Sequence, residues 1–251
     1  DYKEIVDSYV NETSWRVKEN STVTYSVGGL ILSNSGAITA NYWLSEVYDE
    51  EIANAHRQGD FHIHDLSMLT GYCAGWSLKQ LLVEGLGGIP GKITSKPAKH
   101  LSTLCNQMVN FLGIMQNEWA GAQAFSSFDT YLAPFVKTDD LSYDQVKKCI
   151  ESFIYGVNTP SRWGTQAPFT NITLDWVVPH DLADLPAIVG GKEMDFCYKD
   201  CQKEMDMINK AFIEVMIEGD ANGRGFQYPI PTYSITKDYD WSETENNKLL
   251  F

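Results

Sequence analysis

The sequence predicts an α/β fold, because short runs that alternate apolar and polar residues lie between longer segments with apolar residues at helical spacing. Residues 61–64 and residues 226–236 alternate with the period of two that is typical of strands. Residues 97–119 and 143–157 instead repeat apolar residues at steps of three and four, as amphipathic helices do. Because such strands and helices alternate along the chain, we expect a sheet covered by helices rather than an all-helical bundle.

The longer helices can be placed from their caps and apolar stripes. Ser45 is expected to cap a helix that Gly59 ends, after a loop at residues 28–32. Pro97 opens the longest stripe, which reaches Trp119 and has a second stripe of small and amide side chains beside it. The second stripe fits either an internal helix pair or a symmetric dimer seam at which Gln107 faces a ligand. Its members are Asn106, Asn110, Gly113, Asn117, Gly121 and Ala124.

In the second half of the chain, Ser142 and Gln145 form a capping box before a helix whose buried face includes Cys149. Cys149 and Cys105 are therefore expected to be core thiols. Residues 179–191 are interpreted as a surface excursion, and a further helix is expected from residue 200 to the stop at residue 219. Two prolines within residues 226–236 predict that this strand is not central throughout.

Composition and charge exclude several classes of protein. Of 251 residues, 43% are hydrophobic and 21% are charged, which is typical of a globular chain. The net charge of −14 disfavours nucleic acid and anionic membranes as the main partner. No apolar run approaches the roughly 18 residues that span a bilayer. Five scattered cysteines, an odd number, indicate a reducing compartment, so we expect a cytoplasmic protein.

The chemistry is expected in the segment 60–76, which gathers polar and thiol side chains at the end of the predicted strand. His62 and His64 alternate with apolar residues, Asp65 turns the chain, and two glycines flank Cys73. A helix from residue 76 to residue 84 follows, and Gly85 stops it. Side chains at the carboxyl end of a strand form the sites of many α/β proteins.

Three roles are open for the histidine pair. Imidazoles two residues apart on a strand can converge on one metal ion, although a hydrolase would need further ligands such as His56, His100 or His180. They can also tie the strand end to carbonyl groups, or they can contact a sugar or a phosphate. Cys73 fits either a buried apolar role or a nucleophile that uses one of these histidines as its base. A polar segment at residues 158–171 contains Arg162 as its only cation and could hold an anionic group.

Long stretches of the chain resemble the catalytic domain of the anaerobic, class III ribonucleoside-triphosphate reductases, which are glycyl-radical enzymes. The most distinctive stretch is residues 116–136, QNEWAGAQAFSSFDTYLAPFV. The resemblance covers practically the whole chain. The other matching stretches are residues 59–66, 71–78, 90–92, 97–100, 158–171, 204–209 and 229–237.

This resemblance implies a fold and a reaction. The fold is a ten-stranded α/β barrel, of which residues 1–251 would form about half, as part of one catalytic domain. The reaction reduces ribonucleoside triphosphates to deoxyribonucleotides, with formate as the usual reductant. An activase with an iron–sulfur cluster and S-adenosylmethionine makes a glycyl radical, which passes to a loop cysteine that takes the 3′ hydrogen of the ribose. A second cysteine helps to remove the 2′ hydroxyl, and Cys73 matches it.

The resemblance also implies roles for other residues. Contacts with the substrate are expected from polar side chains near the thiol and in the segment 158–171. The amide stripe falls in the region where the family dimerises and binds the ATP or deoxynucleotide effector that selects the substrate. The expected substrate contacts are His62, His64, Asp65, Asn158, Ser161 and Arg162, and the expected effector contacts are Asn106, Gln107 and Asn110.

We expect this chain to be part of a larger enzyme. The loop cysteine, the radical glycine and the structural zinc site of the family are expected outside this chain, together with the nucleotide-sensing cone domain. We therefore expect no metal or cofactor within the segment and no turnover by the segment alone. The alternatives are a non-catalytic module for nucleotide binding and dimerisation, another glycyl-radical enzyme, and a metal-dependent hydrolase.

Overall fold

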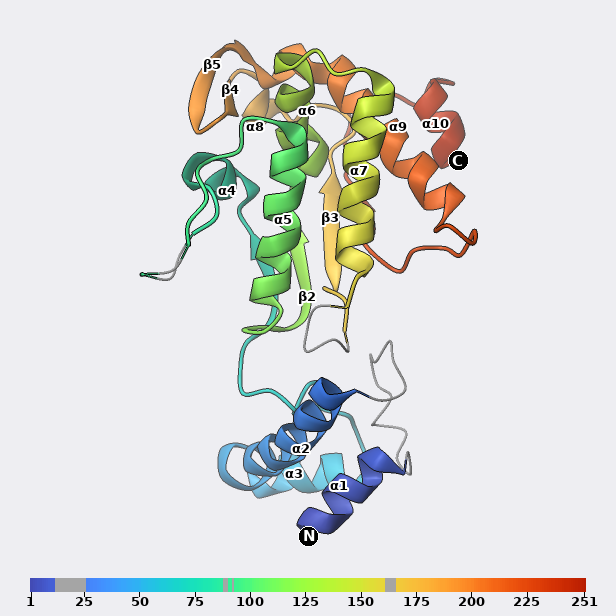
Figure 1. Ribbon diagram of the computed structural model, residues 1–251. Coiled ribbons are helices and arrows are strands. Elements are labelled where there is room, and N and C mark those ends of the chain that lie inside the picture. The colour runs from blue at the N-terminus through green and yellow to red at the C-terminus, as the bar shows by residue number, and fades with distance from the viewer. Residues whose placement is uncertain (12–25, 88–89, 92, 161–165) are drawn as a thin grey trace. The chain divides into compact units, whose positions relative to one another are not determined.

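The computed structural model describes residues 1–11, 26–87, 90–91, 93–160 and 166–251 (Figure 1). The chain forms two compact units. Across the described part of the chain, no helix is long and apolar enough to cross a membrane. The first unit comprises Asp1–Ala74, Gly113–Ala122 and Thr159–Pro168, and the second comprises Gly75–Leu112, Gln123–Asn158 and Phe169–Phe251.

Helices dominate the N-terminal part of the first unit. Helix α1 (Tyr2–Val10) is followed by α2 (Val27–Tyr42), which continues into a π-helical turn (Trp43–Val47), and then by α3 (Glu50–Gln58). The loop expected at residues 28–32 is wrong, because Ser26 caps α2 by accepting a hydrogen bond from the Gly29 amide at 2.8 Å. Ser45 lies within the π-helical turn and Asp49 precedes α3. The predicted stop at Gly59 is confirmed, with φ at +84°.

Helix α2 has an unusual distribution of buried residues. Its buried positions are Gly29 and Gly36, whereas Val27 and Ile38 are 68% and 66% exposed. A Cβ atom on Gly36 would lie 2.8 Å from the Cβ atom of Ser67. The helix therefore turns a glycine towards a closely packed neighbour, while the large apolar side chains of Val27, Ile31 and Ile38 are exposed.

A four-stranded sheet in the order β1-β2-β3-β6 gives the chain its α/β character. β2 pairs in parallel with β3, and β3 pairs in parallel with β6. Ala124 lies opposite Asn171, and Thr173 lies opposite Thr232. The predicted α/β fold, a sheet with long helices, is confirmed. The strands are β1 (Tyr72–Trp76), β2 (Ala120–Phe125), β3 (Thr170–Leu174) and β6 (Ile230–Tyr233).

The long helices bury their apolar stripes, as the sequence predicts. The apolar residues of α7 at the predicted core positions, among them Phe153 and Val157, are buried, and so are those of α9 and of most of α5. The expected core thiol is confirmed for Cys105, which is buried, whereas Cys149 is only half-buried. In the capping box of α7, the Ser142 amide donates to Gln145 Oε1 at 2.9 Å, and the Gln145 amide donates to Ser142 Oγ at 3.3 Å. Figure 1 shows α5 and α7 running along the sheet. The helices are α5 (Leu101–Met115), α6 (Phe128–Thr138), α7 (Tyr143–Asn158) and α9 (Gln202–Glu218).

Two predicted features differ in the structure. The helix that begins after Pro97 ends at Met115, so Gly121 and Ala124 lie on strand β2 and not on a helical stripe. The surface excursion expected at residues 179–191 is wrong, because residues 187–189 are buried in a hairpin. Apolar side chains make this hairpin part of the core. The remaining elements are α4 (Leu78–Glu84), α8 (His180–Ala183), β4 (Pro186–Val189), β5 (Lys192–Cys197), a 3-10 turn (Tyr198–Cys201) and α10 (Glu245–Leu250).

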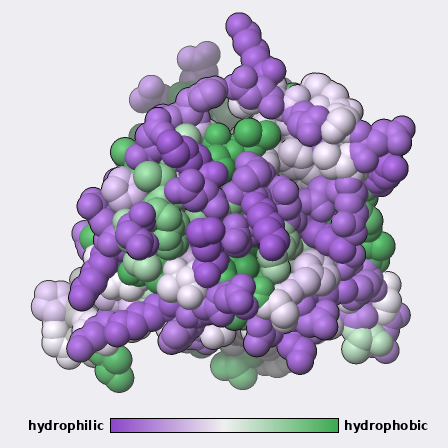
Figure 2. All heavy atoms as spheres, turned by 90° about the horizontal axis from the view of Figure 1, so that it is seen from above, coloured by the Kyte–Doolittle hydropathy of each residue, from purple (hydrophilic) through white to green (hydrophobic). Residues whose placement is uncertain are grey.

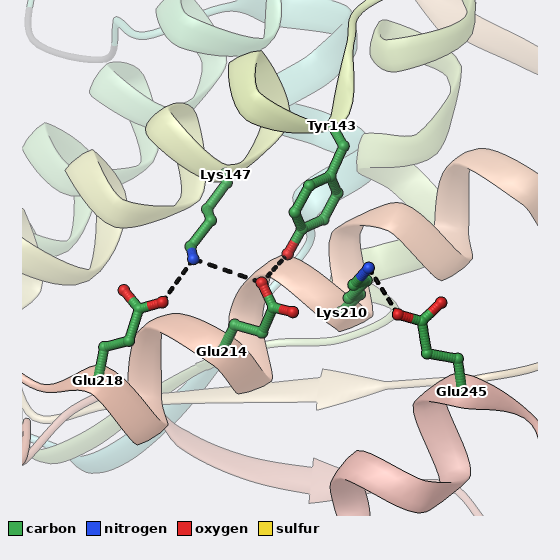
Figure 3. A network of polar contacts seen from close by, with 6 residues as sticks. All are labelled: Tyr143, Lys147, Lys210, Glu214, Glu218 and Glu245. Carbon is green, nitrogen blue, oxygen red and sulfur yellow. Dashed lines mark hydrogen bonds and ion pairs between the residues drawn. The ribbon is translucent and has the colours of Figure 1, made fainter.

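A charged network joins α7, α9 and α10 at the surface (Figure 3). The Tyr143 hydroxyl donates a hydrogen bond to Glu214, and Lys147 Nζ lies 3.3 Å from Glu214 Oε2 and 2.6 Å from Glu218 Oε1. Lys210 Nζ lies 2.6 Å from Glu245 Oε1 and 4.7 Å from the ring centre of Tyr143. The hydrogen bond from Tyr143 lowers the pKa of Glu214, as does the charge of Lys147. Hydrophilic side chains also predominate on the face shown in Figure 2, in accord with the net charge.

A buried carboxylate, Asp129, ties α6 and α9 to the carboxyl end of β3. Asp129 Oδ1 accepts from the amides of Thr130 at 3.0 Å and Asp175 at 2.8 Å. Asp129 Oδ2 accepts from the Trp176 amide and from Asn209 Nδ2, both at 2.9 Å. Burial raises the pKa of Asp129 to about 6, although these hydrogen bonds oppose the shift. The folded protein therefore holds a proton at Asp129 more tightly than the unfolded chain does.

Replacing Asp129 by Asn is expected to change the pH dependence of stability. Because the pKa of Asp129 is raised on folding, its contribution to stability is complete below about pH 4 and is lost by about pH 6, roughly 3 kcal/mol in all. Asp129→Asn also loses acceptor oxygens, so we expect lower stability at every pH but a smaller decline from pH 4 to 6. Urea unfolding at both pH values measures this, with the exposed Asp195→Asn as control. An unchanged decline in Asp129→Asn would contradict it.

Replacing Glu214 by Gln is expected to lower the free energy of unfolding by about 1 kcal/mol, because partly buried Lys147 and Tyr143 lose a charged partner. Asp184→Asn is the matched control, since its ion pair with Lys199 is 82% and 56% exposed. This control should leave stability nearly unchanged, because solvent screens an exposed ion pair. Denaturant unfolding measures both, and equal effects would show that the network of Figure 3 adds nothing beyond an exposed pair.

Candidate functional site

Cys73 is the second residue of β1 and has an unusual backbone conformation. Its φ is +54°, a region that residues other than glycine rarely occupy. The thiol is exposed, and Sγ accepts a hydrogen bond from the Ala122 amide at 3.3 Å. The sulfur is therefore both accessible and fixed in place by the neighbouring strand.

Two glycines near Cys73 make room for neighbouring side chains. Gly121 has φ at +73°, and a Cβ atom there would lie 2.9 Å from Cys73 Sγ and 2.9 Å from a ring carbon of Tyr72. A Cβ atom on Gly71 would lie 2.2 Å from the Trp119 ring. Gly71 therefore leaves room for the Trp119 ring, and Gly121 leaves room for Cys73 and Tyr72. Sequence reasoning did not assign Gly121 this role.

Tyr72 links Cys73 to Asp65. The pKa of Tyr72 is raised, first by the charge interaction with neighbouring Cys73, then by burial and by the Asp65 carboxylate. Asp65 has φ at +55°, and its carbonyl accepts from the Met68 amide at 3.2 Å, so the predicted turn at Asp65 is confirmed. The structure thus brings two predicted site residues, Asp65 and Cys73, to a tyrosine that sequence reasoning did not select.

The strand expected at residues 61–64 is wrong. This segment has no strand pairing, and Phe61, His62 and His64 are all exposed. The Ile63 amide instead donates to His56 Nδ1 at 3.1 Å, which fastens the segment to the end of α3. The His62 ring centre lies 5.3 Å from that of His56 and 4.7 Å from that of His64. No group of three or more metal-binding side chains with metal-site geometry occurs within the described ranges.

The side chain of Asn158 forms hydrogen bonds with the backbone of the protein. Its Nδ2 donates to the carbonyls of Ile154 and Tyr228, both at 2.7 Å, and its Oδ1 accepts from the amides of Gln227 and Tyr228 at 3.1 Å. Three of these four bonds fasten the end of α7 to the segment before β6, and the bond to Ile154 lies within the helix. A contact between Asn158 and a substrate would have to replace one of them. The predicted contacts Ser161 and Arg162 lie outside the described residues.

The three residues expected to bind an effector differ in accessibility. Asn106 and Asn110 are exposed on α5, where Asn110 Nδ2 donates to Asn106 Oδ1 at 2.9 Å. Gln107 is 3% exposed, and its Nε2 donates to Ser95 Oγ at 2.7 Å and to the Lys96 carbonyl at 2.8 Å. Gln107 therefore fastens α5 to residues 95–96, and the two asparagines remain available to a ligand.

Asn171 on β3 and Thr232 on β6 form a polar pair on one face of the sheet, which sequence reasoning missed. Along β3, Thr170, Ile172 and Leu174 are buried, whereas Asn171 and Thr173 are half-buried. Asn171 Nδ2 donates to Thr232 Oγ1 at 3.2 Å across β3 and β6. The alternation within residues 170–174 was a usable signal, because it separates Asn171 from the buried positions.

Comparison with known proteins gives a consistent result. The family model for anaerobic ribonucleoside-triphosphate reductase matches residues 19–251. The curated anaerobic ribonucleoside-triphosphate reductase of Escherichia coli (strain K12) is 25% identical over 123 residues, which are 47% of this chain and 17% of that protein. This chain therefore spans only part of the length of the curated relative that it matches.

Solved structures of anaerobic ribonucleotide reductase from Thermotoga maritima share the fold. One with MES in the active site superposes with a TM-score of 0.67 at 23% identity, over 93% of this chain and 40% of that chain. One with dATP in the specificity site gives 0.65 at 22% identity, over 92% and 41%. The predicted α/β fold and the predicted resemblance are both confirmed.

Replacing Gly121 by Ala tests the packing around the thiol. The added Cβ atom meets Cys73 Sγ and the Tyr72 ring, and alanine at positive φ is strained, so we expect a loss of about 1–3 kcal/mol in the free energy of unfolding. Gly75→Ala is the control, because a Cβ atom on Gly75 has nothing within 4 Å. Thermal or urea unfolding measures both variants. Equal stability of Gly121→Ala and Gly75→Ala would contradict the packing described.

Proposed function

The chain belongs to the anaerobic ribonucleoside-triphosphate reductase family, and from this premise we propose that it contributes part of the site that reduces ribonucleoside triphosphates to deoxyribonucleoside triphosphates. The observation that carries the proposal is the Cys73 sulfur, exposed yet fixed by the Ala122 amide. A thiol that acts on a ribose must be open to ligand and held at one position. Cys73 meets both requirements.

The proposed role of Cys73 is to supply the proton with which the 2′ hydroxyl leaves as water. Replacing this hydroxyl by hydrogen needs two electrons, and formate supplies them when it is oxidised to carbon dioxide. A radical on a cysteine elsewhere in the enzyme takes the 3′ hydrogen of the ribose. Gly121 serves the reaction by leaving room around the sulfur.

The nucleotide contacts that we propose follow from charge. A triphosphate is strongly anionic, and the chain carries a net charge of −14, so local cationic or hydrogen-bonding groups have to hold it. His62 and His64 are exposed beside Asp65 and can donate to phosphate or sugar oxygens. Arg162 and Ser161 remain proposed contacts on the strength of the family resemblance. Asn158 is a weaker candidate, because its amide is already fully bonded.

Effector binding and assembly are proposed on separate grounds. Asn106 and Asn110 present an exposed amide pair on α5 that can bind an ATP or deoxynucleotide effector. A structure of the Thermotoga maritima enzyme is described with dATP and CTP. We extend nucleotide binding to this chain by that likeness, together with a homodimer, a cytoplasmic location and an activase that uses S-adenosylmethionine.

Replacing Cys73 by Ser tests the proposed function. In the complete reductase, supplied with activase, S-adenosylmethionine and formate, Cys73→Ser is expected to reduce deoxynucleotide formation to background, because a serine hydroxyl is a much weaker acid than a thiol and does not supply the proton. Cys197→Ser is the control, since Cys197 lies at the end of β5 and its Sγ donates to the Asp184 carbonyl. Chromatography of the products measures turnover. Retained turnover by Cys73→Ser would overturn the proposal.

A further inference from the structure

We infer that a neutral triad on the sheet, Asn171, Thr173 and Thr232, binds the ribose hydroxyls of the nucleotide. The inference deepens the proposed function and rests on it. It concerns how the sugar is held, and the chemistry at Cys73 is a separate matter. The triad would add three substrate-binding side chains that lie outside the segments first expected to contact the nucleotide.

The strand pairing places the neutral triad on one face of the sheet. Thr173 lies opposite Thr232, and Asn171 lies opposite Ala124 on β2 and Ile230 on β6. Side chains at paired positions of neighbouring strands point to the same side, so these five residues share a face. The alternate residues of β3 point to the other face and are buried. The triad therefore lies on the accessible face of the sheet.

The paired positions on this accessible face carry no charged side chain. Beside the neutral triad they hold Ala124 and Ile230, and Ile230 is 42% exposed. Of all residues in the chain, 21% are charged, and charged residues normally occupy exposed positions. A face of small, neutral and apolar side chains with a few polar groups is instead typical of sites that bind small molecules.

The neutral triad has hydrogen-bonding capacity that the described part of the chain does not use. Asn171 Nδ2 donates to Thr232 Oγ1 at 3.2 Å, and Thr232 Oγ1 lies 3.5 Å from Asn171 Oδ1. An asparagine side chain has two N–H donors and an oxygen with two lone pairs, so this pairing leaves at least one donor and one lone pair of Asn171 unfilled. The half-buried Thr173 hydroxyl forms no hydrogen bond with the residues that the structure describes. Half-buried polar groups of this kind need partners.

Ribose hydroxyls match the neutral triad in chemistry. Each hydroxyl both donates and accepts hydrogen bonds, which suits an amide that presents a free donor beside a free acceptor. The sugar is uncharged and fits a face without charged side chains, whereas the triphosphate needs cationic groups elsewhere. Ala124 leaves space opposite Asn171, and Ile230 offers apolar contact to the carbon atoms of the sugar.

The test removes the Asn171 side chain and the sugar hydroxyls in turn. Equilibrium dialysis measures the binding of CTP and of its 2′,3′-dideoxy analogue to the complete reductase, without activase and with the effector sites saturated by dATP. We expect Asn171→Ala to weaken the binding of CTP by about tenfold and that of the analogue by less than about twofold. The two losses differ because the deleted hydrogen bonds exist only with the hydroxylated sugar.

Variants of Thr232 provide matched controls. Thr232→Val removes the hydroxyl with little change of shape and is expected to weaken CTP binding by about twofold to tenfold, whereas Thr232→Ser keeps the hydroxyl and should bind CTP as the unaltered enzyme does. Thr236→Val should also leave binding unchanged, because Thr236 is an exposed threonine beyond the end of β6. Urea unfolding checks that each variant keeps its fold.

Equal losses for CTP and its dideoxy analogue would overturn the inference, because the side chain would then act on the fold or on another part of the nucleotide. Unchanged CTP binding in Asn171→Ala would overturn it too. A loss for CTP without a loss for UTP would assign the contact to the base and have the same consequence. These measurements involve no turnover, so retained turnover by Cys73→Ser would sink the proposed function and leave the ribose contact standing.

Discussion

The carboxylate of Asp129 joins three segments of the second unit that lie far apart in the sequence. It accepts from the start of its own helix α6, from the two residues that follow β3, and from Asn209 on α9. Burying a charged carboxylate away from water is costly unless hydrogen-bond donors fill its acceptor positions. Four donors fill those of Asp129. The helices α6 and α9 and the end of β3 are therefore fixed relative to one another by one side chain.

Helices with a buried stripe could be predicted because the signal is local. The Ser142 and Gln145 capping box and the spacing of Phe153 and Val157 place α7 within a residue of its observed start. The Asp129 site could not be predicted in this way. Its partners Asp175 and Asn209 are 46 and 80 residues distant, and an aspartate in the first turn of a helix normally suggests an exposed residue that favours the helix dipole.

At the candidate site, too, features that depend on contacts between distant residues could not be predicted from local patterns. Alternation at residues 61–64 suggested a strand, but a strand forms only where a neighbour supplies hydrogen bonds, and Ile63 bonds to His56 instead. The actual strand, YCAGW at residues 72–76, lacks the β-branched residues that mark strands. Pairing with β2 and the room left at Gly121 determine it. The choice of Cys73 therefore came from the family resemblance more than from periodicity.

Helix α2, with buried glycines and exposed apolar side chains, is expected to have low local stability. In the described part of Asp1–Ala74, the buried core side chains are those of Tyr9, Ala53 and Leu66, one of them a single methyl group. So little apolar burial offsets only a small part of the entropy of ordering a helix. Segments of this kind open at a lower free energy than the packed core of a protein. We therefore expect the amides of α2 to exchange hydrogen, and α2 to be cleaved by proteases, while the segments that Asp129 joins are still protected.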